Sequence, residues 1–324
     1  MTELVDELVH SLASNVTLSK ERRELLRVLL ARVIDTPESE TANRDLRLAV
    51  GAIDELLTAL TLFQRHQDRP KLTIFGSARV SAQDRYYDMT MELAHQMADL
   101  GWMTVTGAGP GIMEASAKGA GRSNTLGVNI NLPYEQTSNA YIDVENMLVT
   151  MKYFFTRKVA LTRGSRAFVV LPGGLGTMDE LFEVLTLLAT GKMSPAPVVL
   201  LDTAAGTYWK SWHRFIDEAA VARGYVGSDE LRLVRTVSSV RDALDEIENF
   251  FSNYSSFNVE GDRGILHLKR TPTDEQCLDL VTTVPALAGQ GYVRDGGSIV
   301  FEFDGRDFAS VRVLIDAVNE WKAP

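Results

Sequence analysis

The sequence predicts an α/β fold with a doubly wound parallel sheet at its centre. Short apolar runs, many of them rich in β-branched residues, have the length of buried strands and lie at 72–75, 103–106, 126–130, 167–171 and 198–201. Helical patterns alternate with these runs, at 87–100, 112–120, 153–162 and 178–189. Such alternation is typical of βαβ units, with helices on both faces of the sheet.

The flanks of this region have a different character. Residues 1–68 contain no strand pattern, and their apolar residues recur at helical spacing, so we expect a helical segment. A polar stretch at 252–258 is interpreted as a linker. Beyond it, strand patterns at 264–269, 291–294 and 299–303 and helical patterns at 274–287 and 308–321 predict a small α+β unit. The expected domains are therefore 1–68, 69–250 and 258–324.

The composition is that of a folded globular protein. Of its 324 residues 45% are hydrophobic and 23% are charged, and the formal net charge is −10. This balance argues against disorder and leaves little attraction for a nucleic acid polymer or a membrane surface. One cysteine, Cys277, excludes an internal disulfide, and five scattered histidines lack metal-ligand spacing, so we assign no metal and no cofactor. Without a secretory or membrane-spanning pattern, we expect a cytoplasmic protein.

Two glycine-rich loops follow predicted strands and precede predicted helices. The first contains Gly107, Gly109 and Gly111, and the second spans residues 172–180. Glycine lets backbone N–H groups approach an anion, and a helix start favours phosphate. For either loop alone, a tight turn between strand and helix is an equally good explanation. Neither loop has the spacing of a dinucleotide or P-loop motif, so the pair indicates a smaller nucleotide-sized ligand.

Charged side chains lie beside the second loop. Helical spacing places Glu180 near the start of the helix, next to the predicted cavity. The segment from Thr177 to Glu180 also fits a capping box, in which Thr177 caps the helix and Glu180 reaches back. Arg157 and Lys158 are adjacent cations on the preceding helix, where a solvated charged face is the alternative interpretation.

These motifs together resemble the LOG family of cytokinin-activating nucleoside 5'-monophosphate phosphoribohydrolases, whose members are often labelled lysine decarboxylases. Residues 172–180 match the family motif PGGxGTxxE, residues 76–79 resemble its first strand-end turn, and Arg157-Lys158 resembles its Arg-Lys pair. Ala108 departs from the glycine that is usual in the first loop. The resemblance covers roughly residues 70–225 and is to the larger bacterial type, so the flanks lie outside the minimal family unit.

The resemblance implies a Rossmann-like nucleotide fold, a homodimer or larger homo-oligomer, and hydrolysis of AMP-like nucleotides, N6-modified cytokinin nucleotides included, to base and ribose 5-phosphate. It implies that Arg157 and Glu180 are the catalytic pair. The substrate-binding residues that it implies are Glu135, Lys158, Gly173, Gly174, Leu175, Gly176, Thr177, Thr186, Gly109, Gly111 and Met113.

The residue types suit this chemistry. Cleavage of an N-glycosidic bond builds positive charge on the ribose, which the Glu180 carboxylate would stabilise while it orients or deprotonates the attacking water. Arg157 stays protonated and would hold phosphate or ribose in register. The alternative function is a nucleotide-binding or sensing protein that uses the same pocket without efficient hydrolysis.

Overall fold

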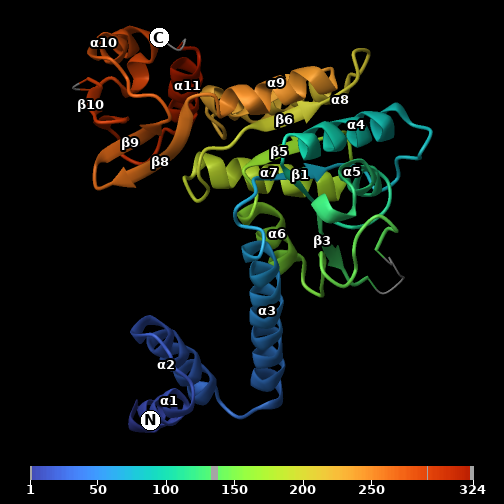
Figure 1. Cartoon of the computed structure of the whole chain (residues 1–324), viewed down its shortest axis with the longest axis vertical. Helices are drawn as coiled ribbons and strands as arrows, with labels where there is room; N and C mark the ends of the chain where they lie inside the picture. The colour runs from blue at the N-terminus through green and yellow to red at the C-terminus, as the bar shows by residue number, and fades with distance from the viewer. Residues whose placement is uncertain (1, 133–137, 290, 322–324) are drawn as a thin grey trace. The chain divides into compact units, whose positions relative to one another are not determined.

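The structure is a computed structural model that describes residues 2–132, 138–289 and 291–321 (Figure 1). The chain divides into two compact units, Met1–Leu57 and Thr58–Pro324. None of the helices in the described ranges combines the length and apolar character that crossing a membrane requires.

The N-terminal unit is helical. It contains α1 (Thr2–Asn15), α2 (Lys20–Asp35) and most of α3 (Glu40–Gln64). Ser19 caps α2, because its hydroxyl accepts a hydrogen bond from the backbone N–H of Arg22 at 3.2 Å. An ion pair of 2.7 Å between Arg27 and Asp6 joins α2 to α1.

A seven-stranded parallel sheet forms the centre of the second unit. Its strands follow the order β4-β3-β2-β1-β5-β6-β7. Their bounds are β1 Lys71–Phe75, β2 Met103–Thr106, β3 Thr125–Ile130, β4 Leu148–Met151, β5 Ala167–Val170, β6 Val198–Leu201 and β7 Val234–Val237. The chain moves outward from β1 to β4, returns to pair β5 with β1, and then moves outward on the other side. The predicted Rossmann-like, doubly wound α/β fold is therefore confirmed.

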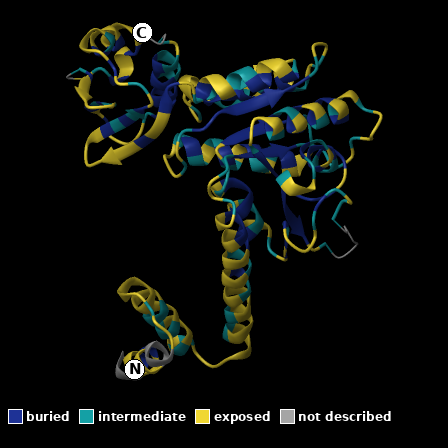
Figure 2. Ribbon diagram, viewed as in Figure 1, coloured by how far each residue is buried: buried dark blue, intermediate teal, exposed yellow. Residues whose placement is uncertain are grey.

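Helices cover both faces of this sheet, and its strands are the most deeply buried part of the unit (Figure 2). One face packs against α4 (Arg85–Asp99), α5 (Ile112–Ala120) and α9 (Val240–Phe250). The other packs against α6 (Phe154–Arg163), α7 (Leu175–Ala189), α8 (Tyr208–Ala219) and the end of α3. Successive residues of one strand serve the two faces, since Ile74 belongs to the first core and Phe75 to the second.

The C-terminal part contains a second, antiparallel sheet of order β10-β11-β9-β8. Its elements are β8 Tyr254–Glu260, β9 Arg263–Leu268, α10 Asp274–Thr283, β10 Val293–Asp295, β11 Ser298–Glu302 and α11 Phe308–Asn319. The interpretation of 252–258 as a linker is wrong, because most of that stretch is β8. An irregular register between Tyr254 and Ser256 leaves Tyr254 and Phe257 buried three residues apart, so the usual alternation is lost.

A buried ionic cluster joins α11 to α9. Arg312 is only 3% exposed, and it pairs with Glu246 of α9 and, at 2.9 Å, with Asp316 of its own helix. Its guanidinium also lies over the ring of Phe250, 4.9 Å from the centroid. Arg235 of β7 shares Asp316. Because a buried charge is costly without its partners, these contacts fix the C-terminal helix in one position.

We expect Arg312→Ala to lower the free energy of unfolding by about 3 kcal/mol, because Glu246 and Asp316 would lose their common partner in a buried site. Arg241→Ala is the matched control. Arg241 lies on α9 and pairs with Asp245 at 2.8 Å, but its side chain is 76% exposed, so its loss should change stability by less than about 1 kcal/mol. Urea denaturation of both variants measures the difference. Equal losses would contradict the assigned role of the buried cluster.

Candidate functional site

A cleft of about 800 Å³ opens at the carboxyl ends of β1 and β5. These strands are neighbours, yet the chain leaves them in opposite directions across the sheet, which makes this the topological switch point where doubly wound folds bind ligands. Four segments line the cleft: the turn after β1, the loop after β2 with the start of α5, the loop after β5 with the start of α7, and part of α6. The named side chains on its wall include Arg157, Glu180 and Met113.

The start of α7 presents free backbone donors to the cleft. Gly174 is the N-cap residue, and no side chain caps the helix. The N–H groups of Leu175, Gly176 and Thr177 belong to the first turn, which lacks intrahelical acceptors and carries the positive end of the helix dipole. The capping-box interpretation is wrong, because α7 begins at Leu175 and Thr177 is its third residue. Glu180 is thereby released from a capping role.

The three glycines of this loop differ in why they are glycine. A Cβ on Gly173 would lie 2.2 Å from Thr177 Oγ1, so the tight turn itself requires glycine there. A Cβ on Gly174 or Gly176 would meet no atom within 4 Å. Packing within the chain therefore explains Gly173 but leaves open space beside Gly174 and Gly176, where a ligand can approach the backbone.

The first glycine loop makes room for the side chains of Arg157 and Met113. A Cβ on Gly107 would lie 2.2 Å from Arg157 Nη2 and 2.6 Å from Met113 Sδ, so only glycine lets both side chains lie against the backbone here. Gly111 has a φ of +67°, and a Cβ on it would lie 2.4 Å from the carbonyl oxygen of Ser77. The first glycine loop and the turn after β1 are thus in direct contact.

Asn139 holds the same loop from the other side. Ala108, the departure from the family pattern, has a left-handed φ of 63°, which costs a residue with a Cβ about 1 kcal/mol. Its carbonyl accepts hydrogen bonds from the backbone N–H of Asn139 at 2.9 Å and from the side-chain amide at 3.1 Å. The amide also donates to the carbonyl of Gly109 at 3.1 Å. Gly109 is buried under this clamp and does not line the cleft.

Arg157 is fixed by two backbone carbonyls. Its Nε donates to Val128 of β3 at 3.0 Å, and its Nη2 donates to Gly107 at 3.2 Å. Burial lowers the pKa of Arg157, and the charge of Glu180 works against this shift. A guanidinium stays protonated at neutral pH even so. The side chain is a positioned cation on the cleft wall, with donors beyond the two already used.

Glu180 has an unusual acidity. Loss of hydration raises the pKa of Glu180 to about 7, and Asp179 and Glu183 add to the rise, whereas Arg157 and Lys158 oppose it. The carboxyl group is therefore poised to exchange a proton near neutral pH. A titratable acid and a fixed cation that lie on one cleft wall and interact electrostatically are typical of catalytic sites.

Two other implied binding residues lie outside the cleft lining, and a third, Glu135, lies outside the described residues. Lys158 forms ion pairs with Asp179 at 3.2 Å and Glu183 at 2.7 Å, and these contacts raise the pKa of Lys158. Thr186 donates to the carbonyl of Phe182 at 2.7 Å and is exposed on α7. Neither side chain lines the cleft. The roles of all three in substrate binding stay predictions.

The structure adds contributors that the sequence analysis did not assign to the site. Ser77 and the exposed Arg79 line the cleft from the turn after β1, and the Ser77 hydroxyl accepts from the N–H of Arg79 at 3.1 Å. Their position directly after β1, one of the two strands at the switch point, is the feature of the sequence that could have indicated a role in the site. The hydroxyl of Tyr208 donates to the carbonyl of Gly173 at 2.6 Å. Within the described ranges, no three His, Cys, Asp or Glu side chains gather as a metal site would need.

Comparison with known proteins gives matches over the central part of the chain. Residues 111–247 match the profile of a family described as "Possible lysine decarboxylase". The chain is 28% identical over 193 residues to cytokinin riboside 5'-monophosphate phosphoribohydrolase LOG2 of Arabidopsis thaliana, covering 58% of this chain and 86% of the relative. It is 28% identical over 185 residues to the LOG enzyme of Oryza sativa subsp. japonica, covering 55% and 72%.

Among solved structures, the X-ray structure of TM1055, a structural genomics target, aligns with a TM-score of 0.41 at 22% identity, over 55% of this chain and 98% of that one. The molybdenum cofactor binding protein of Rippkaea orientalis aligns with the same TM-score at 21% identity, over 56% and 96%. The profile match includes the second glycine loop and α6, and the chain extends beyond these relatives. The domain that carries the PGGxGTxxE motif is thus similar to the LOG enzymes.

Proposed function

We propose that the protein is a nucleoside 5'-monophosphate phosphoribohydrolase that hydrolyses AMP-like nucleotides, N6-modified ones among them, to the free base and ribose 5-phosphate. The observation that carries the proposal is the combination on one cleft wall of Glu180, with its pKa of about 7, the fixed cation Arg157 and an uncapped helix start. The LOG enzymes named above support the substrate class.

The substrate phosphate would bind at the start of α7. Backbone N–H groups of Leu175, Gly176 and Thr177 supply donors, and the helix dipole supplies a favourable field. The open space beside Gly174 and Gly176 allows the close approach that this mode of binding needs. A phosphate held in this way leaves the ribose beside Glu180, which lies one and a half turns further along the same helix.

Glu180 would act in its ionised form. As the bond between base and ribose breaks, the bonding electron pair leaves with the base and positive charge develops on the ribose ring. The carboxylate stabilises that charge and accepts a proton from the water whose oxygen attacks the anomeric carbon. Because Glu180 is partly buried, this charge stabilisation is stronger than it would be in bulk solvent. The base takes up a proton from solvent, which balances the proton that the attacking water gives to Glu180.

Arg157 would position the substrate. Its two bonds to Val128 and Gly107 hold the guanidinium in one orientation, and its remaining N–H groups can donate to phosphate or ribose oxygens. It also keeps the pKa of Glu180 from rising further. We therefore assign Arg157 both substrate orientation and electrostatic support of Glu180.

We also propose that the protein works as a homodimer or larger homo-oligomer. Large apolar side chains are exposed near the cleft, on α6 and α7: Leu175 is 91% exposed, Phe154 58% and Phe182 40%. Leu175 itself lines the cleft. Exposed apolar residues grouped in this way are typical of protein interfaces.

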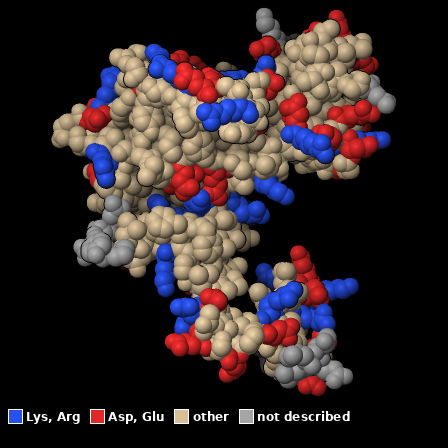
Figure 3. All heavy atoms as spheres, turned by 180° about the vertical axis from the view of Figure 1, so that it is seen from behind, with Lys and Arg blue, Asp and Glu red and all other residues tan. Residues whose placement is uncertain are grey.

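A small ligand suits the charge distribution better than a polymer. On the face shown in Figure 3, basic and acidic side chains are interspersed. The chain carries a net charge of −10, so phosphate would be attracted locally, by the helix start and Arg157.

The direct test is a base-release assay with AMP, GMP, CMP, UMP and N6-modified AMP, followed by chromatography of the free bases. We expect release from at least one nucleotide, and we expect Glu180→Gln to lower kcat by about 10²–10⁴-fold while the substrate still binds. Glu218→Gln is the control, since Glu218 is an exposed glutamate of α8 outside the cleft lining. Saturable AMP binding without any base release would reject the hydrolase and favour a nucleotide sensor.

The acidity of Glu180 predicts the pH dependence of the reaction. With a pKa of about 7, Glu180 is mostly protonated below pH 7 and mostly ionised above it. Because the ionised form is the reactive one, kcat/KM should fall about tenfold for each pH unit below 7 and level off above 7. Initial rates from pH 5.5 to 9 provide the measurement. A kcat/KM that decreases as the pH rises through 7 would contradict the assignment of Glu180 as base and charge stabiliser.

A further inference from the structure

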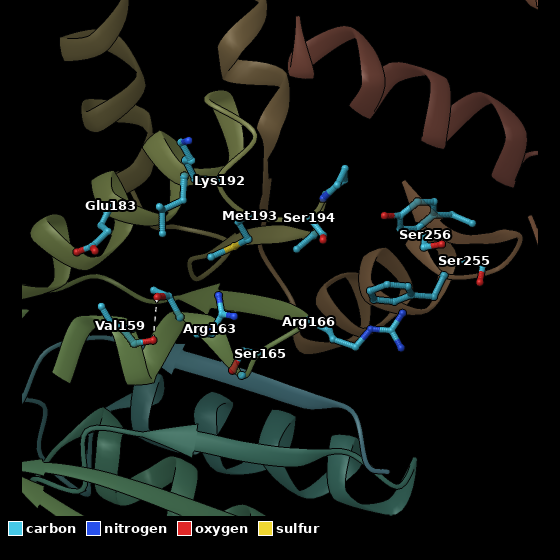
Figure 4. Close-up of a pocket in the computed structure, with 17 residues that line it drawn as sticks. Val159, Arg163, Ser165, Arg166, Glu183, Lys192, Met193, Ser194, Ser255 and Ser256 are labelled. Atoms are coloured by element: carbon cyan, nitrogen blue, oxygen red, sulfur yellow. Dashed lines mark hydrogen bonds between the residues drawn. The ribbon is translucent and has the colours of Figure 1, made fainter. Parts of the chain in front are cut away.

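We propose that a second cavity, at the amino ends of the strands of the parallel sheet, binds a small molecule carrying two or more phosphate groups. The cavity has a volume of about 620 Å³ and lies before the amino ends of β5 and β6, against the first strand of the C-terminal sheet (Figure 4). The candidate active site lies beyond the carboxyl ends of β1 and β5, so the two sites lie at opposite ends of the strands.

The cavity is positive in an acidic protein. Arg163, Arg166 and Lys192 line it, from the end of α6, the segment before β5 and the turn after α7. Glu183 is the one carboxylate among its lining residues, and it pairs at 2.7 Å with Lys158, which also pairs with Asp179. A chain with a net charge of −10 thus places three cations around one hollow. Such local reversal of charge attracts anions.

All three cations lie close to the carboxyl ends of α6 and α7, and one of them is also held by an aromatic ring. Cations at the carboxyl end of a helix interact favourably with its dipole, and Arg163 and Lys192 lie at or just beyond the ends of α6 and α7. Arg166 lies three residues beyond the end of α6, as Lys192 does beyond α7, and it immediately precedes β5. The backbone N–H of Arg166 donates to the carbonyl oxygen of Lys71 at 2.9 Å. Its guanidinium carbon lies 4.7 Å from the centroid of the Phe251 ring. This contact holds the guanidinium in place before any ligand arrives.

The remaining lining suits an organic phosphate. Ser194, Ser255 and Ser256 bring hydroxyl groups to the cavity, and Figure 4 places the last two on the side of the C-terminal sheet. Hydroxyl and cationic donors from several directions match the many oxygens of linked phosphates. Val159 and Met193 supply an apolar wall for the carbon skeleton of the ligand. A single carboxylate would leave most of these donors unused.

The test is calorimetric titration of the full chain with ADP, inorganic pyrophosphate and citrate. We expect ADP and pyrophosphate to bind, and we expect the double variant Arg163→Gln/Lys192→Gln to lose one class of site, with affinity at least about 100-fold weaker, tenfold for each cation removed. Binding at the glycine loop should survive in that variant. Arg223→Gln is the control, since Arg223 is an exposed arginine outside the cavity and should change nothing.

Two outcomes would overturn the proposal. One is an ADP isotherm that is the same in the double variant as in the wild type. The other is citrate binding at this site as tightly as pyrophosphate, which would show that the cavity does not select phosphate. Circular dichroism of the variants checks that the exposed substitutions leave the fold intact. Because the readout is binding rather than turnover, the test stands whether or not the protein releases bases from nucleotides.

Discussion

A carboxylate deprived of water beside a fixed guanidinium is the interaction on which the site depends. The positive charge of Arg157 limits the rise in the pKa of Glu180, so that the carboxyl group can still ionise near neutral pH. Hydrogen bonds to the carbonyls of Val128 and Gly107 fix the position of Arg157. Gly107 in turn has no side chain to push the guanidinium away. The sheet supplies the frame for this chain of contacts, since the return of the chain to pair β5 with β1 brings α7 back over the loops of the first half.

Function and stability pull in opposite directions at Glu180. A carboxyl group whose pKa rises from 4.5 to about 7 on folding favours the native state only while it is protonated. Its contribution to stability is complete below pH 4.5 and is lost as the pH rises toward 7 and beyond, which is where the ionised group would work. The surrounding contacts, among them the Asn139 clamp on the strained Ala108, compensate by holding the loops in place. A site that stores unfavourable charge in this way is pre-organised for a cationic transition state.

Burial decides how far the fold can be predicted from the sequence. The inner strands are buried on both faces and read as apolar runs, so β2 and β6 are predicted at their observed bounds. The edge strands β4 and β7 are partly exposed and mixed in composition, so neither is predicted from the sequence. For the site, the motif residues Arg157 and Glu180 are recognisable along the chain. Asn139 and Tyr208 are not, because their roles arise only from hydrogen bonds to segments about thirty residues away.

The pKa of Glu180 tests the proposed interaction between Glu180 and Arg157 most directly. A carbon-13 NMR titration of its side-chain carboxyl, assigned by comparison with Glu180→Gln, reports the pKa without any substrate or assumed reaction. We predict a pKa of about 7 in the native protein, and a still higher value in Arg157→Gln, where the stabilising cation is lost. A pKa near the ordinary glutamate value of about 4.3, unchanged by loss of Arg157, would contradict the central claim.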